Sequence, residues 1–344
     1  MNTRPVRTFT ISPNPKRSPR NFFPRHGSVI SLTRDELQRL QEKWGYVVKY
    51  EFESQGNPIV RHIHTADPAA LVKGDTLWLF AGRDQNGNQS GYVMKDWLVF
   101  STTDMKHWTQ YPVPLKVEDF KWAASKQAYA GHVAERNGKY YWYVSTNWCG
   151  IGVAVSDKIT GPYKDALGKP LLTNKDCFDS HHSWACIDPA VFVDDDGQAY
   201  LTWGNRECYI VKLKDNMIET EGEVKRIHID ESHPFTEAPW IHKHNGKYYL
   251  TYASEWPEKI AYAVADHIEG PYETKGIISE IAGNSNTTHP AIVNFKGQWI
   301  FISHNGGLPT GTSYSRSIVA EPMEYNADGS IKPIPPTAEG VKTL

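Results

Sequence analysis

Residues 186–203 read CIDPAVFV, then DDDG, then QAYLTW: an apolar run, a short turn that ends in glycine, and a second apolar run. β-Branched and aromatic residues fill both runs, and a turn closed by glycine between two such runs is typical of a β-hairpin. An acidic residue, Asp188, stands just before a proline at the start of the first run. This stretch decides the fold because the same pattern occurs four more times in the chain.

The five copies share one order of features: an inner run that starts with a polar residue, a turn containing glycine, and an aromatic-rich second run. They fall at residues 66–80, 130–143, 186–203, 236–252 and 288–302. Each copy is followed by a third apolar run, and two copies then carry the phrase Gly-Pro-Tyr before a fourth run. Repeats of about 50 residues with four strands each are typical of propeller blades. The sequence therefore predicts an all-β protein, a five-bladed β-propeller that forms one domain over residues 63–344.

Residues 1–62 lack the repeat, and their start is rich in proline and basic residues. We expect an irregular N-terminal arm that packs on the propeller and carries one short helix at residues 31–41. Thr33 and Glu36 have the spacing of a capping box there. The first residues include no apolar signal core, so we expect either an intracellular protein or a secreted or periplasmic one whose leader is missing from this sequence.

The composition excludes some partners. The net charge of −2 gives no reason to expect nucleic acid or an anionic membrane as a partner. No apolar run approaches the roughly 20 residues that a membrane helix needs. The 12 Trp and 18 Tyr suit either a β-rich fold or the stacking of sugars on aromatic rings, and the composition leaves both open. We expect a monomer whose cysteines are buried free thiols, with a bridge between Cys177 and Cys186 as the alternative.

The starts of the inner strands carry the chemistry. In a propeller the innermost strand of each blade lines the central channel, so residues distant in sequence meet at one end of it. Like charges held close raise the pKa of at least one carboxyl group, and perturbed carboxyl groups mark functional sites. Capping of a strand entry would explain one such carboxylate but not three at the same level. The residues that we place at the five strand starts are Asp67, His132, Asp188, Glu237 and His289.

The phrases around these residues resemble glycoside hydrolase family 43. They are HTADPA at 64–69, IDPAVF at 187–192, EAPW at 237–240 and THPAIV at 288–293. The resemblance covers about residues 60–335, and within the family the chain is most similar to the arabinofuranosidase and xylosidase members, including enzymes that trim arabinose from arabinoxylan. It implies an inverting, exo-acting hydrolase that releases α-L-arabinofuranosyl units from plant cell-wall polysaccharides or oligosaccharides.

The resemblance also implies roles for single residues. Asp67 matches the general base that activates water, Glu237 the general acid, and Asp188 the carboxylate that orients the acid and keeps its pKa high. Arg316 matches an arginine that contacts the sugar and the carboxylates, and His289 a channel histidine found near a bound calcium ion. Inverting hydrolysis needs an acid and a base about 6.5–9.5 Å apart, and carboxylates on blades one and four of a propeller face each other across such a gap.

Other residues of the expected pocket leave alternatives open. Residues 129–132 read YAGH where many family members have Trp-Ala-Pro or Trp-Ala-Ala, so His132 binds substrate or packs on the channel wall. Four tryptophans are candidate sugar platforms, with packing inside a blade as an equally good explanation: Trp122, Trp148, Trp184 and Trp256.

Two rival predictions and one additional prediction accompany the main one. The close rival is the same chemistry on β-D-xylosides, or on both sugars, because xylose and arabinofuranose present similar hydroxyl groups. The distant rival is a non-catalytic propeller that binds carbohydrate. Calcium in the central channel is a further prediction that rests on His289 and the family resemblance. Only one protein ligand is suggested, so water would hold most of the ion.

Overall fold

The computed structural model of this chain describes residues 39, 49–85, 91–123, 127–146 and 150–344. The compact unit that contains the repeats runs from Gly45 to Leu344. Among the described residues, Arg39 is the one with α-helical structure, and two short 3-10 turns are present, η1 (Val117–Asp119) and η2 (Asn174–Asp176). No helix in these residues is long and apolar enough to cross a membrane. The helix predicted at residues 31–41 otherwise lies outside the described residues.

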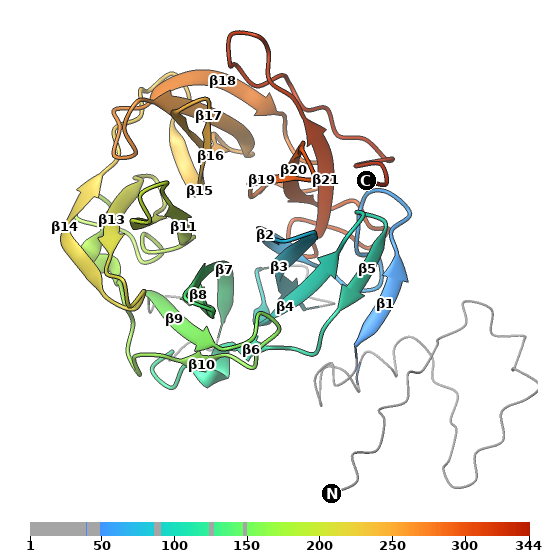
Figure 1. The fold of residues 1–344 in the computed structure, drawn as a ribbon, viewed down its shortest axis with the longest axis horizontal. Helices are drawn as coiled ribbons and strands as arrows, with labels where there is room; N and C mark the ends of the chain where they lie inside the picture. The colour runs from blue at the N-terminus through green and yellow to red at the C-terminus, as the bar shows by residue number, and fades with distance from the viewer. Residues whose placement is uncertain (1–38, 40–48, 86–90, 124–126, 147–149) are drawn as a thin grey trace, which may run out of the picture. The chain divides into compact units, whose positions relative to one another are not determined.

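Five antiparallel sheets surround a central axis, which confirms the predicted five-bladed propeller (Figure 1). Blade 1 contains β2 (Ala66–Lys73), β3 (Thr76–Asp84), β4 (Met94–Thr102) and β5 (His107–Gln110), with β1 (Tyr50–Glu53) outside β5 and β6 (Leu115–Lys116) paired with β4. Blade 2 contains β7 (Ala128–Arg136), β8 (Lys139–Thr146), β9 (Gly150–Ser156) and β10 (Lys164–Asp165).

The remaining three blades follow in chain order. Blade 3 contains β11 (Ala190–Val193), β12 (Ala199–Trp203), β13 (Tyr209–Leu213) and β14 (Thr220–Arg226). Blade 4 contains β15 (Phe235–His244), β16 (Lys247–Ser254), β17 (Lys259–Ala265) and β18 (Glu273–Ser279). Blade 5 contains β19 (Ala291–Phe295), β20 (Gln298–Asn305) and β21 (Ser317–Met323).

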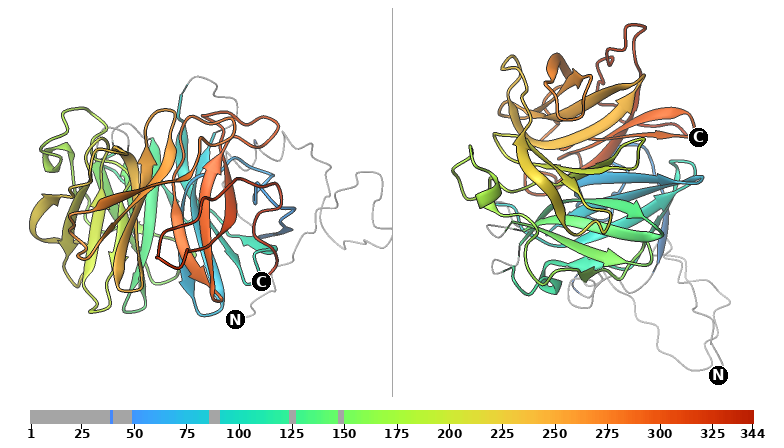
Figure 2. Two further views of the ribbon diagram at one scale, coloured as in Figure 1. Left: turned by 90° about the horizontal axis from the view of Figure 1, so that it is seen from above. Right: turned by 60° about the vertical axis from the view of Figure 1, so that its left-hand side comes forward.

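The inner strands β2, β7, β11, β15 and β19 form the wall of the channel. Each lies beside the inner strands of the two neighbouring blades (Figure 1), and Figure 2 shows the five sheets from the side. Each inner strand pairs with the second strand of its blade, as the five predicted hairpins require. The residues that start the inner strands therefore gather around one end of the axis.

The segment before β2 closes the ring. Blade 5 has three strands, and the chain from Asn57 to Thr65 runs along its outer strand β21. The peptide N–H of Ile59 donates to the carbonyl of Ile318 (2.9 Å), and the Asn57 side chain makes two bonds to the backbone of Ala320 (2.9 and 3.1 Å). The predicted arm extended to residue 62. In the structure, β1 pairs with β5 in blade 1, and the segment from Asn57 to Thr65 covers the outer edge of the three-stranded blade 5, so both belong to the propeller.

Aromatic side chains fill the space between blades. Trp142 of blade 2 packs edge-on against Phe80 of blade 1, with ring centroids 5.2 Å apart. Together with Trp97, Trp108 and Trp203 it is less than 2% exposed. Packing between sheets therefore accounts for much of the aromatic content. This agrees with the first of the two explanations given above, a β-rich fold. Of the cysteines, Cys149 lies outside the described residues, and the other three are buried free thiols.

Candidate active site

A pocket of about 680 Å³ opens at the end of the channel where the inner strands begin. Its volume lies in the range typical of small-ligand sites. Side chains from all five blades line it, and its charged, tyrosine and asparagine side chains are Asp67, Tyr92, Tyr129, Asp188, Asn205, Arg206, Glu237, Glu255, Glu258 and Arg316. The structure thus brings together the three predicted carboxylates and the predicted arginine, which are up to 249 residues apart in sequence.

A local backbone feature directs two of these carboxylates. Asp67 and Asp188 each precede a proline and have φ values of 51° and 56°. Proline disfavours the right-handed helical region for the residue before it, and aspartate tolerates the left-handed region better than most residues. The β2–β3 ladder also shifts register between Ala66 and Ala69. A β-bulge of this kind takes a residue out of the ladder and re-aims its side chain.

Blade 4 uses the same feature with a different residue, which corrects the predicted equivalence of the five strand starts. The position that matches Asp67 is held by Ala238, whose φ is 59° and which also precedes a proline. Glu237 stands one residue earlier, in a ladder that shifts register on both sides of it. A glutamate at this preceding position still lines the pocket. In blade 2 the matching residue is Ala130, two positions before His132.

Arg316 connects two aspartates at the floor of the site. Its Nε and Nη2 donate to the two carboxylate oxygens of Asp84 (2.9 Å each), and its Nη1 donates to Oδ1 of Asp67 (2.7 Å). The guanidinium also lies 5.0 Å from the centroid of the Tyr92 ring. Burial opposes the positive charge, but the carboxylates of Asp67 and Asp84 raise the pKa of Arg316 above its ordinary value. The guanidinium is therefore a fixed cation with its direction set by Asp84.

We predict that Asp84→Asn destabilises the fold. The side chain of Asp84 is fully buried, and the substitution leaves a buried guanidinium without its bidentate partner. Breaking a buried ion pair in this way costs about 3–5 kcal/mol. The free energy of unfolding from urea denaturation should fall by that amount. The matched variant Asp75→Asn, in an exposed turn, should change it by less than about 0.5 kcal/mol; equal stability of the two variants would refute this account of Asp84.

Asp188 and Asn205 hold the segment that carries Glu237. The peptide N–H of Ala238, the residue after Glu237, donates to Oδ2 of Asp188 (3.1 Å). The Asn205 amide donates to Oε2 of Glu237 (2.6 Å). Asp188 is thereby tied to the backbone of Glu237, while Asn205 fixes one of its carboxylate oxygens. Both contacts come from blade 3, so the neighbouring blade holds Glu237 of blade 4 in place.

Burial dominates the electrostatics of the three predicted carboxylates. It raises the pKa of Asp67, and Arg316 offsets part of this effect. It raises the pKa of Asp188 well above its ordinary value, and the nearby charges of Glu237 and Asp67 add to the increase. Burial also raises the pKa of Glu237. The hydrogen bond from Asn205 lowers this pKa, and the negative charge of Asp67 raises it further. Carboxyl groups whose environments differ in this way can serve as a proton acceptor and a proton donor in one site.

Several polar residues in or beside the site were not predicted from the sequence, among them Asp84, Asn205 and Glu258. Asp84 ends β3, Asn205 follows β12, and Glu258 precedes β17, so each lies at a blade edge where the repeat shows no fixed residue. Their signal was weak because one charged or amide residue beside a strand is usually a solvated surface residue. A search for polar residues at the channel end of every second and third strand would have found them.

The two predicted histidines are buried beside the pocket and are not among its lining residues. His132 packs against Trp240, with ring centroids 4.9 Å apart, and its Nδ1 accepts the N–H of Val191 (3.3 Å). Nδ1 of His289 lies 3.9 Å from Oδ2 of Asp188. Burial lowers the pKa of both imidazoles to about 3, which makes them neutral groups of the channel wall.

The predicted tryptophan platforms divide into two groups. Trp184 and Trp256 line the pocket and are 41% and 63% exposed, so their rings are available at its rim. Trp122 lies outside the lining residues and donates its indole N–H to Asp165 (3.0 Å), which is packing within blade 2. Trp148 is outside the described residues.

The described residues near His289 form no cluster of calcium ligands. Calcium takes six to eight oxygen ligands, usually with several carboxylates or carbonyls among them. In the described parts of the chain, no group of three or more His, Cys, Asp or Glu side chains is arranged to hold a metal ion. No step of the chemistry below is therefore assigned to calcium.

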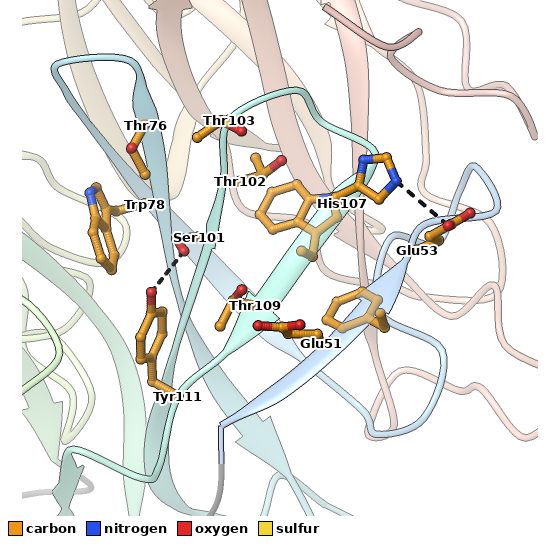
Figure 3. A pocket seen from close by; sticks show the side chains of 12 residues that line it. Glu51, Glu53, Thr76, Trp78, Ser101, Thr102, Thr103, His107, Thr109 and Tyr111 are labelled. Atoms are coloured by element: carbon orange, nitrogen blue, oxygen red, sulfur yellow. Dashed lines mark hydrogen bonds and ion pairs between the residues drawn. The ribbon is translucent and has the colours of Figure 1, made fainter. Parts of the chain in front are cut away.

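A second hollow, of about 560 Å³, lies on the outer strands of blade 1 (Figure 3). Trp78, Ser101, Thr109 and Tyr111 line it, and Ser101 and Tyr111 share a hydrogen bond of 3.1 Å. Its carboxylates come from β1 and have 65% and 54% exposed side chains. Solvated carboxylates of this kind are poor candidates for acid–base pairs, so the channel pocket is the candidate active site.

Comparison with known proteins agrees with this site. The model of the family "Glycosyl hydrolases family 43" matches residues 55–331. The chain belongs to this family, as the phrases around Asp67, Asp188, Glu237 and His289 predicted, and it is a hydrolase of glycosidic bonds.

The relatives cover most of the chain. A xylosidase/arabinosidase 43A of Humicola insolens is 33% identical, over 80% of this chain and 98% of that protein. An arabinoxylan arabinofuranohydrolase of Bacillus subtilis is 29% identical, over 84% of this chain and 66% of that protein. A β-xylosidase/α-arabinofuranosidase from a compost microbial metagenome, solved with xylotriose in a calcium-free form, is 30% identical. It has a TM-score of 0.75 and covers 83% of this chain and 99% of its own.

Proposed function

We propose that the protein is an inverting exo-glycosidase that releases α-L-arabinofuranosyl units from plant arabinose-containing polysaccharides or oligosaccharides. The observation that carries this proposal is the convergence of Asp67, Asp188 and Glu237 in one pocket, with Arg316 fixed between Asp67 and Asp84. The names of the relatives that act on arabinoxylan support the choice of substrate.

In this proposal Asp67 is the general base. It accepts a proton from a water molecule, and that water attacks the anomeric carbon from the face opposite the leaving group. Arg316 donates to Asp67, which stabilises the ionised form that a base requires.

Glu237 is the general acid. Its proton passes to the glycosidic oxygen as the bond between that oxygen and the anomeric carbon breaks. Asp188 positions Glu237 through the N–H of Ala238, and its negative charge, when present, opposes early ionisation of the acid. Trp184 and Trp256 form the rim on which sugar rings stack.

The same site also suits β-D-xylosides. Two of the relatives described above carry both sugar specificities in their names, which favours a β-D-xylosidase or a dual enzyme as the second candidate. The residues that set the choice are those around the sugar hydroxyls, whereas the acid and base serve both sugars. A carbohydrate-binding propeller without catalysis is a more distant candidate, and an acid–base pair in the pocket gives it no support.

A pair of aryl substrates tests the proposal. Purified protein is assayed with 4-nitrophenyl α-L-arabinofuranoside and 4-nitrophenyl β-D-xyloside under the same conditions, and release of terminal sugars from arabinoxylan is followed by chromatography. We expect turnover of the arabinofuranoside and release of single arabinose units. A higher kcat/KM on the xyloside would favour the second candidate. Tight binding of oligosaccharides with no turnover of either substrate would overturn the enzyme proposal.

Calcium bound at His289 mainly through water remains a separate prediction. Loss of activity after exhaustive chelation, restored by calcium and not by magnesium, would support it, and unchanged activity and melting temperature would contradict it. A monomeric state is likewise a proposal, for which light scattering is the test.

A further inference from the structure

The hollow on blade 1 has the chemistry of a ligand site. Its volume of about 560 Å³ lies in the range typical of small-ligand sites. Trp78, Ser101, Thr109 and Glu51 form one row across it, because each is paired with the next in the β3–β4–β5–β1 ladders. Residues paired in register point to the same face of a sheet. The row therefore presents an aromatic ring, two hydroxyl groups and a carboxylate side by side (Figure 3).

Two aromatic rings form the apolar side of the hollow. Trp78 and Tyr111 lie with ring centroids 5.5 Å apart and ring planes inclined by 32°, and both residues are half-buried. The Tyr111 hydroxyl shares a hydrogen bond of 3.1 Å with Oγ of Ser101, which holds the ring in place. Neighbouring rings that are fixed in this way form a platform, and the flat apolar C–H face of a sugar stacks on such a platform.

Polar groups surround this platform. Among the described residues, the hydroxyl groups of Thr103 and Thr109 have no hydrogen-bond partner in the protein, and the side chains of Glu51 and Glu53 are exposed. A carboxylate accepts hydrogen bonds from hydroxyl groups, and a threonine hydroxyl can both donate and accept. These groups therefore suit a ligand that carries several hydroxyl groups around an apolar ring face.

The charges of the hollow favour a neutral ligand. Nζ of Lys49 lies 3.2 Å from the carboxylate of Glu51, and Nζ of Lys106 lies 3.9 Å from that of Glu53. Each carboxylate thus has a cation beside it, and among the described residues these pairs leave little net charge to attract a phosphate or a polyanion. A neutral sugar chain matches this balance, because it brings hydroxyl groups and apolar faces without charge.

The hollow is separate from the candidate active site. In the described parts of the chain, the two have no lining residue in common. Strand β3 runs from Thr76 at the hollow to Asp84, the partner of Arg316 at the floor of the active site. Trp78 lies six residues before Asp84, and a strand rises by about 3.3 Å per residue, so about 20 Å of strand separates them. A long polymer can reach both places, whereas a small glycoside occupies one.

We propose that the hollow is a secondary carbohydrate-binding site that holds a neutral, pentose-rich plant polysaccharide such as arabinoxylan. The choice of polysaccharide rests on the proposed function, whereas the binding of a neutral sugar chain follows from the platform and its polar surroundings. A sugar ring stacks on Trp78 and Tyr111, and its hydroxyl groups bind Thr109 and Glu51. A polymer held here has a raised effective concentration at the active site, as in other bivalent binding.

The test compares a polymer with a small substrate in the variant Trp78→Ala. The Kd for soluble arabinoxylan, measured by isothermal titration calorimetry, should rise by about 10-fold or more, as it does when an aromatic anchor is truncated. The KM for arabinoxylan should rise with little change in kcat. On the preferred aryl glycoside, kcat/KM should stay within about twofold of the wild-type value, because this substrate binds in the channel pocket alone.

Two further variants separate binding from damage to the fold. Thr109→Arg keeps both rings but fills the hollow with a long side chain, so it should weaken arabinoxylan binding even if Trp78→Ala fails to fold. Trp299→Ala removes a half-buried ring from blade 5, outside the hollow, and should leave arabinoxylan binding unchanged.

The outcomes distinguish this site from the proposed function. Unchanged affinity for arabinoxylan in folded Trp78→Ala and Thr109→Arg would overturn the secondary site. A lower melting temperature without weaker binding would do so as well, and would mean that the protein's own chain packs on this face. Weaker arabinoxylan binding by both variants, in a protein whose wild type turns over no glycoside, would support the secondary site and overturn the proposed function instead.

Discussion

Asp67→Asn should reduce kcat/KM on the preferred aryl glycoside by about 10³-fold or more, the largest effect that we expect from any single substitution. General-base catalysis supplies about 10²–10⁴-fold in rate, and the asparagine amide cannot accept the proton of the attacking water. The change also removes the anionic partner of Nη1 of Arg316 (2.7 Å). Because the attacking water is needed for every substrate, the loss should be similar for good and poor leaving groups.

The matched control for Asp67→Asn is Asp75→Asn, the same chemical change in an exposed turn of blade 1. It should retain wild-type kinetics. The melting temperature of both variants shows whether the loss of activity follows loss of the fold. A folded Asp67→Asn protein with the wild-type rate would mean that another group accepts the proton of the water.

Glu237→Gln should also be severely impaired, but in a way that depends on the leaving group. The amide cannot deliver a proton, so hydrolysis of the phenyl glycoside should fall by about 10²–10⁴-fold. With the 2,4-dinitrophenyl glycoside the leaving group departs as a stable phenolate that needs no proton, so its hydrolysis should fall far less. Burial raises the pKa of Glu237, so the wild-type enzyme should keep its acid protonated to a higher pH than an ordinary glutamate and lose activity as the pH rises through that pKa.

The pH profile of Glu237→Gln completes this prediction. The basic limb of the wild-type profile should be absent in the variant, because no acid remains to be deprotonated. The acidic limb should remain, since it reports protonation of Asp67, whose pKa is also raised by burial. An unchanged basic limb, or equal losses on the two aryl glycosides, would assign the general acid to another residue.

The blade pattern could be predicted from the sequence because propeller hairpins have strong local signals. Alternating β-branched and aromatic residues, together with glycine at the turns, identify each inner pair of strands without knowledge of the others. The ring closure could not be predicted in this way. The contacts of Asn57 with β21 join residues 263 positions apart, and an asparagine in an irregular stretch gives no local sign of such a partner.

Some residues of the active site could likewise be predicted from local sequence signals, and others could not. Asp67 and Asp188 could be predicted because each occupies a repeated position before a proline. Glu237 was predicted at the same strand-start position, whereas the structure places it one residue before that repeated position. Asp84, Asn205 and Glu258 come from blade edges, and only the assembled channel shows that they meet the predicted residues. Sequence repeats thus identify the strand starts, and packing of the blades identifies their partners.

The stereochemistry of the first-formed sugar tests the central claim most directly. Hydrolysis of whichever aryl glycoside the wild-type protein turns over faster is followed by proton NMR from the first minute, before the product anomers equilibrate. An acid and a base on opposite sides of the sugar predict that the first product has the anomeric configuration opposite to that of the substrate. A first product with the configuration of the substrate would require a covalent intermediate, and it would contradict the roles given to Asp67 and Glu237.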